Sequence, residues 1–389
     1  MQGPVIKRVE VYSFSHGTGG DSPIIENIMV RVAARAGEDI IEGWGEGPTG
    51  DPAVTGQTRE IADDDMMRRV APAIMGRSFF TADDIIDLTG EASSLRHGMG
   101  SAICALDSAL FDLLGRFLNL PVCSLMREYL WLAPLKEFSP ADEPYPVTTG
   151  EQILGGEVEC TDDTVIIDGR GLFDSPDQFM ISCANMLDKT SAVIQPFHRD
   201  HFSMTRKLKK ALRDEGISCP VLFDGFSASR EMARELLSCR AFDGIVFRPG
   251  RDGGMANLLG ICDLLKNYKD FILALRGEPS TGWGATALHH MFQGAMEFFH
   301  PRMLFIPAPL AVESMGGLKL SGRDSDATFA RPGFGRELDR DFLESSSLTG
   351  SVAAIKDGEM IIQSFPYLRG KPDFRRVNRY RPEPVAPGK

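Results

Sequence analysis

Ala102-Ile-Cys-Ala-Leu-Asp-Ser-Ala-Leu-Phe-Asp-Leu-Leu-Gly-Arg-Phe-Leu-Asn-Leu-Pro-Val122 is the stretch that decides the fold. Its apolar residues recur at spacings of three and four, which is the pattern of one face of a helix. The residues on that face are Ala102, Leu106, Ala109, Leu110, Leu113 and Leu114. The same periodicity begins near Thr58, so we predict a helical region from there to Leu118.

The residues before this helical region are typical of strands. Val5 to Phe14, Ile28 to Ala34 and Ile40 to Trp44 are rich in β-branched residues, and a turn is predicted at Gly37 to Asp39. A glycine-rich loop, Ser15 to Asp21, separates the first two of these segments. Strands followed by helices predict an α+β unit at the N-terminus.

From residue 130 on, short apolar runs alternate with amphipathic stretches. The runs are Val165–Ile167, Ala192–Ile194, Val221–Phe223, Ile245–Phe247, Phe271–Ala274 and Met303–Ile306. Repeated strand and helix units predict a parallel sheet, and this number of units favours a closed (β/α) barrel over an open sheet. Near the C-terminus, a hairpin is predicted around Asp357-Gly358.

Composition and charge narrow the class of protein and partner. The chain has 389 residues, which is longer than one hydrophobic core usually grows, so we expect more than one domain. The net charge of -12 argues against nucleic acid and anionic membranes as partners and leaves small molecules. The cysteines are scattered without CxxC pairs, and the N-terminus lacks an apolar segment of signal or membrane-spanning length, so we expect a cytoplasmic protein.

Several motifs, in their order along the chain, resemble the mandelate racemase/muconate lactonizing branch of the enolase superfamily. They are Gly43-Trp-Gly-Glu-Gly47, Ala102 to Val122, Pro249-Gly-Arg-Asp-Gly-Gly254, Thr281-Gly-Trp-Gly284 and Pro332-Gly-Phe-Gly-Arg-Glu-Leu-Asp339. The helix motif departs only at its end, where Arg127 stands for a usual glycine. The resemblance implies an α/β fold: a modified (β/α) TIM-like barrel at 128–330, an α+β capping domain at 1–127, and a C-terminal segment at 331–389 that returns to the capping domain.

The resemblance also implies a metal site. In the family, acidic residues on three successive barrel strands hold a divalent cation, usually Mg²⁺, which stabilises the enolate formed when a base removes the proton α to a carboxylate. Asp168 matches the ligand of the third strand and Asp224 that of the fifth. Ile194 stands at the middle position, on the fourth strand. Because ligand number and charge set the affinity, we expect poor magnesium binding.

The positions of the family's basic residues differ as well. The second strand in the family carries a Lys-x-Lys pair, but the stretch from Pro134 to Val165 holds only Lys136 and is too short for two complete strand and helix units. Arg248 stands where the muconate-type branch has a lysine on the sixth strand, and Arg170 shares a strand face with the metal ligand two residues before it. These always-protonated side chains either form buried ion pairs that replace the metal structurally or bind an anionic substrate or intermediate.

Two further candidates follow predicted strands. His198, with His201 close by, follows the fourth strand and is interpreted either as an acid or base or as part of a solvated loop. Glu278 ends the seventh strand and is interpreted either as a base or as the ion-pair partner of Arg276. The candidate catalytic residues are therefore Arg248, Arg170, His198 and Glu278.

Two functions are consistent with these residues. The first is an isomerase or lyase that acts on a small carboxylate by α-proton abstraction and enolate stabilisation. The second is a catalytically inactive homologue that binds a ligand or a protein partner. The capping domain and the polar strand ends favour the enzyme. Relatives commonly assemble through their barrels, so we expect a homo-oligomer.

Overall fold

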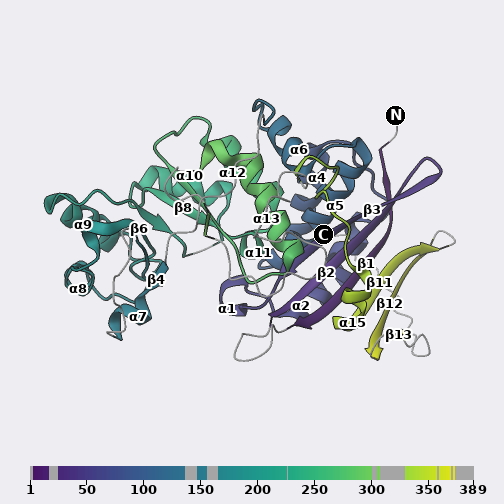
Figure 1. The fold of residues 1–389 in the computed structure, drawn as a ribbon, viewed down its shortest axis with the longest axis horizontal. Coiled ribbons are helices and arrows are strands. Elements are labelled where there is room, and N and C mark those ends of the chain that lie inside the picture. The colour runs from purple at the N-terminus through teal and green to yellow at the C-terminus, as the bar shows by residue number, and fades with distance from the viewer. Residues whose placement is uncertain are drawn as a thin grey trace, which may run out of the picture.

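The computed structural model describes residues 3–16, 25–135, 147–155, 165–225, 227–299, 305–306, 329–356, 359–368 and 371–372. Its strands form two sheets, which lie on opposite sides of a group of helices (Figure 1). Lys136 and most of the predicted glycine-rich loop lie outside the described residues.

The first sheet is antiparallel and combines both ends of the chain. Its strands are β1 (Val5–His16), β2 (Ile25–Ala36), β3 (Asp39–Pro48), β11 (Ser347–Lys356), β12 (Glu359–Leu368) and β13 (Lys371–Pro372). The order across the sheet is β13-β12-β11-β1-β2-β3. Lys356 pairs with Glu359, which confirms the predicted hairpin, and β11 pairs with β1, so the C-terminal strands extend the N-terminal sheet.

Helices cover this sheet. They are α1 (Pro52–Thr55), α2 (Arg59–Asp65), the π-helix η1 (Met66–Val70), α3 (Ala71–Ile74), α4 (Ala82–Ser93), α5 (Gly100–Leu118) and α6 (Val122–Tyr129). The predicted helix Ala102 to Leu118 is α5, and it is buried on nearly all sides. It lies directly on β3: a Cβ atom at Gly43, Gly45 or Gly47 would be only 2.1 to 2.3 Å from a backbone oxygen of α5. The three glycines therefore allow this close approach.

The second sheet is parallel and curled. Its strands are β4 (Val147–Thr149), β5 (Val165–Asp168), β6 (Thr190–Ile194), β7 (Val221–Phe223), β8 (Gly244–Phe247), β9 (Ile272–Arg276) and β10 (Phe305–Ile306). They lie in chain order, and every neighbouring pair is parallel. Each of the six predicted apolar runs overlaps one of these strands, which confirms the predicted βα units. The result is part of a barrel wall.

Helices on the outside of the curled sheet separate its strands in the sequence. They are α7 (Gly150–Leu154), α8 (Pro176–Ser182), η2 (Leu187–Lys189), α9 (Phe202–Asp214), α10 (Arg230–Cys239), α11 (Pro249–Asp252), α12 (Met255–Leu265), α13 (Gly282–Ala295) and η3 (Met296–Phe298). A further helix, α15 (Arg340–Ser346), precedes β11. No helix in these described ranges is both long and apolar enough to cross a membrane.

A separate apolar cluster lines the inside of the curled sheet. Its buried members are Ile166, Ala192, Ile194, Leu222, Val246 and Ala274. Before β5 the described residues contain one barrel strand, β4, and its residues Val147-Thr148-Thr149 include no lysine. The described part of the chain therefore contains no Lys-x-Lys pair on the strand next to β5.

Candidate active site

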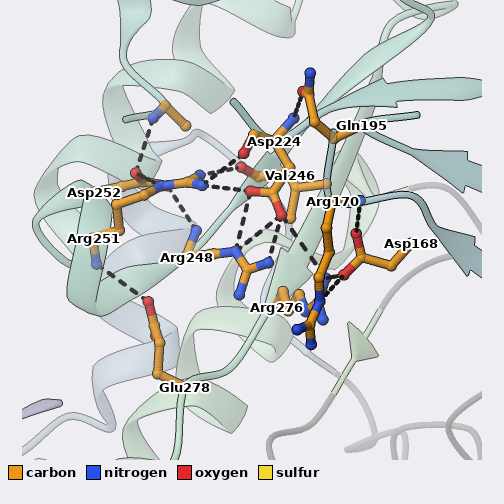
Figure 2. A network of polar contacts seen from close by, with 11 residues as sticks. Asp168, Arg170, Gln195, Asp224, Val246, Arg248, Arg251, Asp252, Arg276 and Glu278 are labelled. Atoms are coloured by element: carbon orange, nitrogen blue, oxygen red, sulfur yellow. Dashed lines mark hydrogen bonds and ion pairs between the residues drawn. The ribbon is translucent and has the colours of Figure 1, made fainter. Parts of the chain in front are cut away.

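Four charged side chains stand at the carboxyl ends of the parallel strands. Asp168, Asp224, Arg248 and Arg276 each lie two positions after an inward-facing residue of the apolar cluster. Because residues two apart on a strand share a face, all four side chains are directed toward the inside of the curled sheet. Figure 2 shows these side chains gathered around one another. Barrel enzymes place their working groups at this end of the strands.

Asp224 is the most heavily paired carboxylate of the group. Arg248 donates from Nε to both carboxylate oxygens at 3.1 Å and from Nη2 to Oδ2 at 2.5 Å, and Arg251 donates to Oδ1. The backbone N–H of Asp224 donates to Gln195 Oε1 at 2.9 Å. Burial alone would raise the pKa of Asp224, but the guanidinium groups of Arg248 and Arg251 hold this pKa well below its ordinary value.

Asp168 is paired with an arginine from a distant strand. Arg276 Nη1 lies 2.6 Å from Asp168 Oδ2 and 3.8 Å from Asp224 Oδ2, so one nitrogen lies between the two carboxylates. Arg170 donates its backbone N–H to Asp168 Oδ1 at 3.2 Å, and its Nε lies 3.9 Å from Oδ2. The Arg170 side chain is 52% exposed, whereas that of Arg276 is 13% exposed.

A second set of contacts holds Arg248 and Arg251 in position. Arg251 donates to Asp252 Oδ1 at 2.7 Å and to the backbone oxygen of Val246 at 2.9 Å. Asp252 also accepts the backbone N–H groups of Arg248 at 2.7 Å and Ala228 at 2.9 Å. These contacts fix the turn after β8, and with it the position from which Arg248 and Arg251 reach Asp224.

Glu278 lies next to this turn but does not pair with Arg276 through a hydrogen bond. Its two carboxylate oxygens accept the backbone N–H groups of Gly250 and Arg251, each at 3.2 Å, while Arg276 forms its ion pairs with the two aspartates. The interpretation of Glu278 as the partner of Arg276 is therefore wrong. Burial raises the pKa of Glu278 to about 7. The residue also lines a cavity of about 30 Å³, which has room for one or two water molecules.

The histidines after β6 contact residues of their own loop. His198 Nδ1 is 3.4 Å from Asp200 Oδ2, its side chain is 59% exposed, and its ring centroid is 5.6 Å from that of His201. These contacts join His198 to its own loop, just before α9. The exposure of His198 and its contact with Asp200 favour the solvated-loop interpretation.

The arrangement does not fit a magnesium ion. Mg²⁺ requires near-octahedral coordination by oxygen ligands. Ile194, which pairs with Asp168 in the sheet, is fully buried and supplies no oxygen, and both oxygens of Asp224 already accept hydrogen bonds from arginines. Within the described ranges, no group of three or more acidic, histidine or cysteine side chains is arranged to hold a metal ion.

Arg251 had no assigned role in the sequence, and Arg276 was considered only as a partner of Glu278. Arg251 lies in the motif Pro249 to Gly254, which indicates a turn but says nothing about the direction of the arginine. Arg276 could have been found by the rule that places Asp168 in the site, because both follow an inward-facing apolar residue by two positions.

A segment near the N-terminus of the chain matches a known family in sequence. Residues 15–126 match the family described as mandelate racemase/muconate lactonizing enzyme, N-terminal domain. The N-succinyl-L-Arg/Lys racemase of Bacillus cereus is 30% identical over 115 residues, which are 30% of this chain. The matched stretch spans only 28% of that relative's length.

Solved structures match over most of the chain. The N-succinyl Arg/Lys racemase from Bacillus cereus has a TM-score of 0.67 at 17% identity, over 90% of this chain and 99% of the other. A dipeptide epimerase from Cytophaga hutchinsonii, complexed with Mg and the dipeptide D-Ala-L-Val, has a TM-score of 0.68 at 17% identity over the same shares. The muconate lactonizing enzyme from Pseudomonas putida has a TM-score of 0.65 at 18% identity, over 88% of this chain and 99% of the other. Residues 15–126 thus match the N-terminal domain of the mandelate racemase/muconate lactonizing enzyme family in sequence, and the chain is similar in fold to these solved racemase, epimerase and lactonizing enzyme structures.

Proposed function

We propose that the protein is an isomerase or lyase that acts on a small carboxylate by removing the proton α to the carboxyl group. The observation that carries the proposal is the cluster of guanidinium groups at the ends of the barrel strands. Four guanidinium groups, those of Arg170, Arg248, Arg251 and Arg276, adjoin the carboxylates of Asp168, Asp224 and Asp252. Such a group attracts an anionic substrate and stabilises negative charge that develops on it.

The names of the relatives support this class of reaction. A racemase and an epimerase invert a stereocentre, which at a carbon next to a carbonyl group is achieved by removing and returning a proton. The dipeptide in the Cytophaga hutchinsonii complex carries a carboxylate, which is the class of substrate proposed here.

The proposed roles follow from exposure and charge. The half-exposed side chain of Arg170 would meet the substrate carboxylate, while the buried Arg248 and Arg276 would stabilise the enolate from inside the barrel. Glu278 is the proposed base, because burial raises its pKa to about 7, where a general base works efficiently at neutral pH.

One observation favours a second candidate function, a catalytically inactive homologue that binds a ligand or a protein partner. The oxygens of Asp224 and Oδ2 of Asp168 are already paired with arginines, so the charged group is largely satisfied by its own members. A network of this kind can persist for structural reasons after catalysis is lost.

Deuterium exchange separates the two candidates. The protein is incubated in D₂O with a panel of dipeptides, N-acyl amino acids and hydroxy acids, and loss of the α-proton signal is followed by NMR. We expect exchange with at least one compound, and a loss of about 100-fold or more in Glu278→Gln. Arg230→Ala is the matched control, because Arg230 pairs with Asp263 in the outer helices. The absence of exchange across the panel would exclude the enzyme and favour the inactive homologue.

A further inference from the structure

We propose that the guanidinium group of Arg276 is a built-in cation that takes the place of the divalent ion between Asp168 and Asp224. The site then holds its two carboxylates together without magnesium. This inference goes beyond the proposed function and holds whether or not the reaction takes place, because it concerns only how the two carboxylates are neutralised.

The position of one nitrogen atom is the first argument. Asp168 ends β5 and Asp224 follows β7, so a third strand, β6, separates the two aspartates in the sheet. Arg276 extends from β9 and places Nη1 at 2.6 Å from one carboxylate and 3.8 Å from the other (Figure 2). Two buried carboxylates that converge in this way would repel each other unless a cation lay between them.

The neighbouring donors are the second argument. The strand between the two aspartates presents Ile194, which is fully buried among apolar side chains. The next residue, Gln195, uses its amide elsewhere: Oε1 accepts from the backbone of Asp224, and Nε2 donates to the backbone oxygen of Phe197 at 2.7 Å. Neither residue offers an oxygen to a metal ion between the aspartates.

Charge is the third argument. Arg248 and Arg251 already occupy both oxygens of Asp224, and their side chains are only 12% and 11% exposed. A divalent ion beside Asp224 would face these two guanidinium groups and that of Arg276 at short range in a poorly solvated site. Repulsion of this kind is strong where water does not screen it. The arginines therefore exclude a divalent ion from the position between Asp168 and Asp224, which the guanidinium group of Arg276 occupies.

Metal uptake by reconstructed sites tests the proposal. Mn²⁺ is the probe, and the signal of free Mn²⁺ in electron paramagnetic resonance measures its uptake by the full-length protein. We expect no stoichiometric uptake by the wild type. The double variant Ile194→Glu/Arg276→Ala restores a third carboxylate and removes the built-in cation, and we expect it to bind one Mn²⁺ per chain. The matched control, Ile194→Glu/Arg251→Ala, has the same formal charge but keeps Arg276, so we expect no stoichiometric uptake.

Three results of this experiment would overturn the proposal. They are stoichiometric uptake by the wild type, equal uptake by the two double variants, and no uptake by a folded Ile194→Glu/Arg276→Ala protein. The test does not use turnover, so its outcome is independent of the exchange experiment on the proposed function.

A thermal measurement covers the case in which the double variants fail to fold. EDTA is expected to leave the melting temperature of the wild type unchanged, whereas Arg276→Met should lower it more than Arg276→Lys, which keeps a positive charge. A wild-type melting temperature that falls with EDTA and recovers with Mg²⁺ would contradict the inference, as would equal effects of the two Arg276 substitutions.

Discussion

Glu278 is a buried carboxyl group that titrates in the neutral range. Burial raises its pKa from the ordinary value of 4.5 to about 7. Between these two pH values the folded protein keeps a proton that the unfolded chain has lost, so the free energy of unfolding falls as the pH rises and levels off above pH 7. Over this pH range the free energy of unfolding falls by roughly 3 kcal/mol, because each factor of ten in proton affinity corresponds to about 1.4 kcal/mol.

Urea unfolding of the wild type and Glu278→Gln at several pH values measures this contribution. Other buried carboxyl groups titrate in both proteins, so their effects cancel in the difference. The substitution also removes one hydrogen-bond acceptor, which lowers the stability of the variant by a constant amount. We expect the variant to gain stability relative to the wild type as the pH rises from 5 to 7. A pH-independent difference would show that Glu278 is ionised throughout this range.

Single residues of the site differed in how far the sequence could predict them. Asp168, Asp224 and Arg248 were located because they stand at positions that resemble the family's metal ligands and sixth-strand lysine, and the structure brings all three together. The pairing of Arg276 with Asp168 joins residues 108 positions apart, and no local pattern encodes which carboxylate an arginine reaches. The sequence therefore indicated the end of the barrel that carries the charged group but not the pairing within it.

At the scale of elements, the contact between β3 and α5 depends on glycine. A Cβ atom at Gly45 would lie 2.1 Å from the backbone oxygen of Ala105, and a backbone atom cannot rotate away as a side chain can. We expect Gly45→Ala to lower the free energy of unfolding by about 3 kcal/mol or more, because the strand and the helix must separate. Urea unfolding followed by circular dichroism gives the value.

Gly90→Ala is the matched control for this substitution. Gly90 lies inside α4, and an added Cβ atom there would have no atom within 4 Å. Alanine is the better helix former, so this variant is expected to gain about 0.5 to 1 kcal/mol. Equal losses in the two variants would mean that the close approach of β3 to α5 is not the cause.

The elements that the sequence predicted correctly are those with long or repeated patterns. The helix α5 has a continuous apolar face, and β5 to β9 are buried runs rich in β-branched or large apolar residues. The strand β4 has only three residues, Val147 to Thr149, and no apolar run marked it. Its place is set by pairing with β5, which is a tertiary contact that a local pattern does not contain.

At the scale of the whole molecule, carboxylates of α5 and β3 cap helices that belong to the curled sheet. Asp107 of α5 accepts the backbone N–H groups of Met255 and Ala256 at the start of α12, and burial raises its pKa to about 8. Asp112 of the same helix accepts the N–H groups of Trp44 and Phe334, at 3.0 and 2.9 Å. The two acidic residues in the motif Ala102 to Val122 therefore hold the barrel and the C-terminal segment against α5.

Glu46 makes the corresponding link from β3. Its buried carboxylate accepts Asn27 Nδ2 at 2.6 Å and the backbone N–H groups of Thr281 and Gly284 at the start of α13. Glu46→Ala would leave these buried donors without their acceptor, at a cost of about 1 to 3 kcal/mol for each group that water does not reach. We expect the free energy of unfolding to fall by about 3 kcal/mol in total.

Two probes in one urea titration locate this effect. Trp283 donates from Nε1 to the backbone oxygen of Trp44 at 3.2 Å, so tryptophan fluorescence reports on the contact between β3 and α13, while circular dichroism reports on the helices throughout. In the wild type we expect the two transitions to coincide, because the contact joins the two sheets and their helices into one cooperative unit. In Glu46→Ala the fluorescence transition should have its midpoint at a lower urea concentration than the circular dichroism transition.

The exposed Glu337, which pairs with Arg116, is the matched control, and Glu337→Ala should lower the free energy of unfolding by less than about 1 kcal/mol. Coincident transitions in Glu46→Ala at the wild-type midpoint would mean that Glu46 does not hold β3 and α13 together.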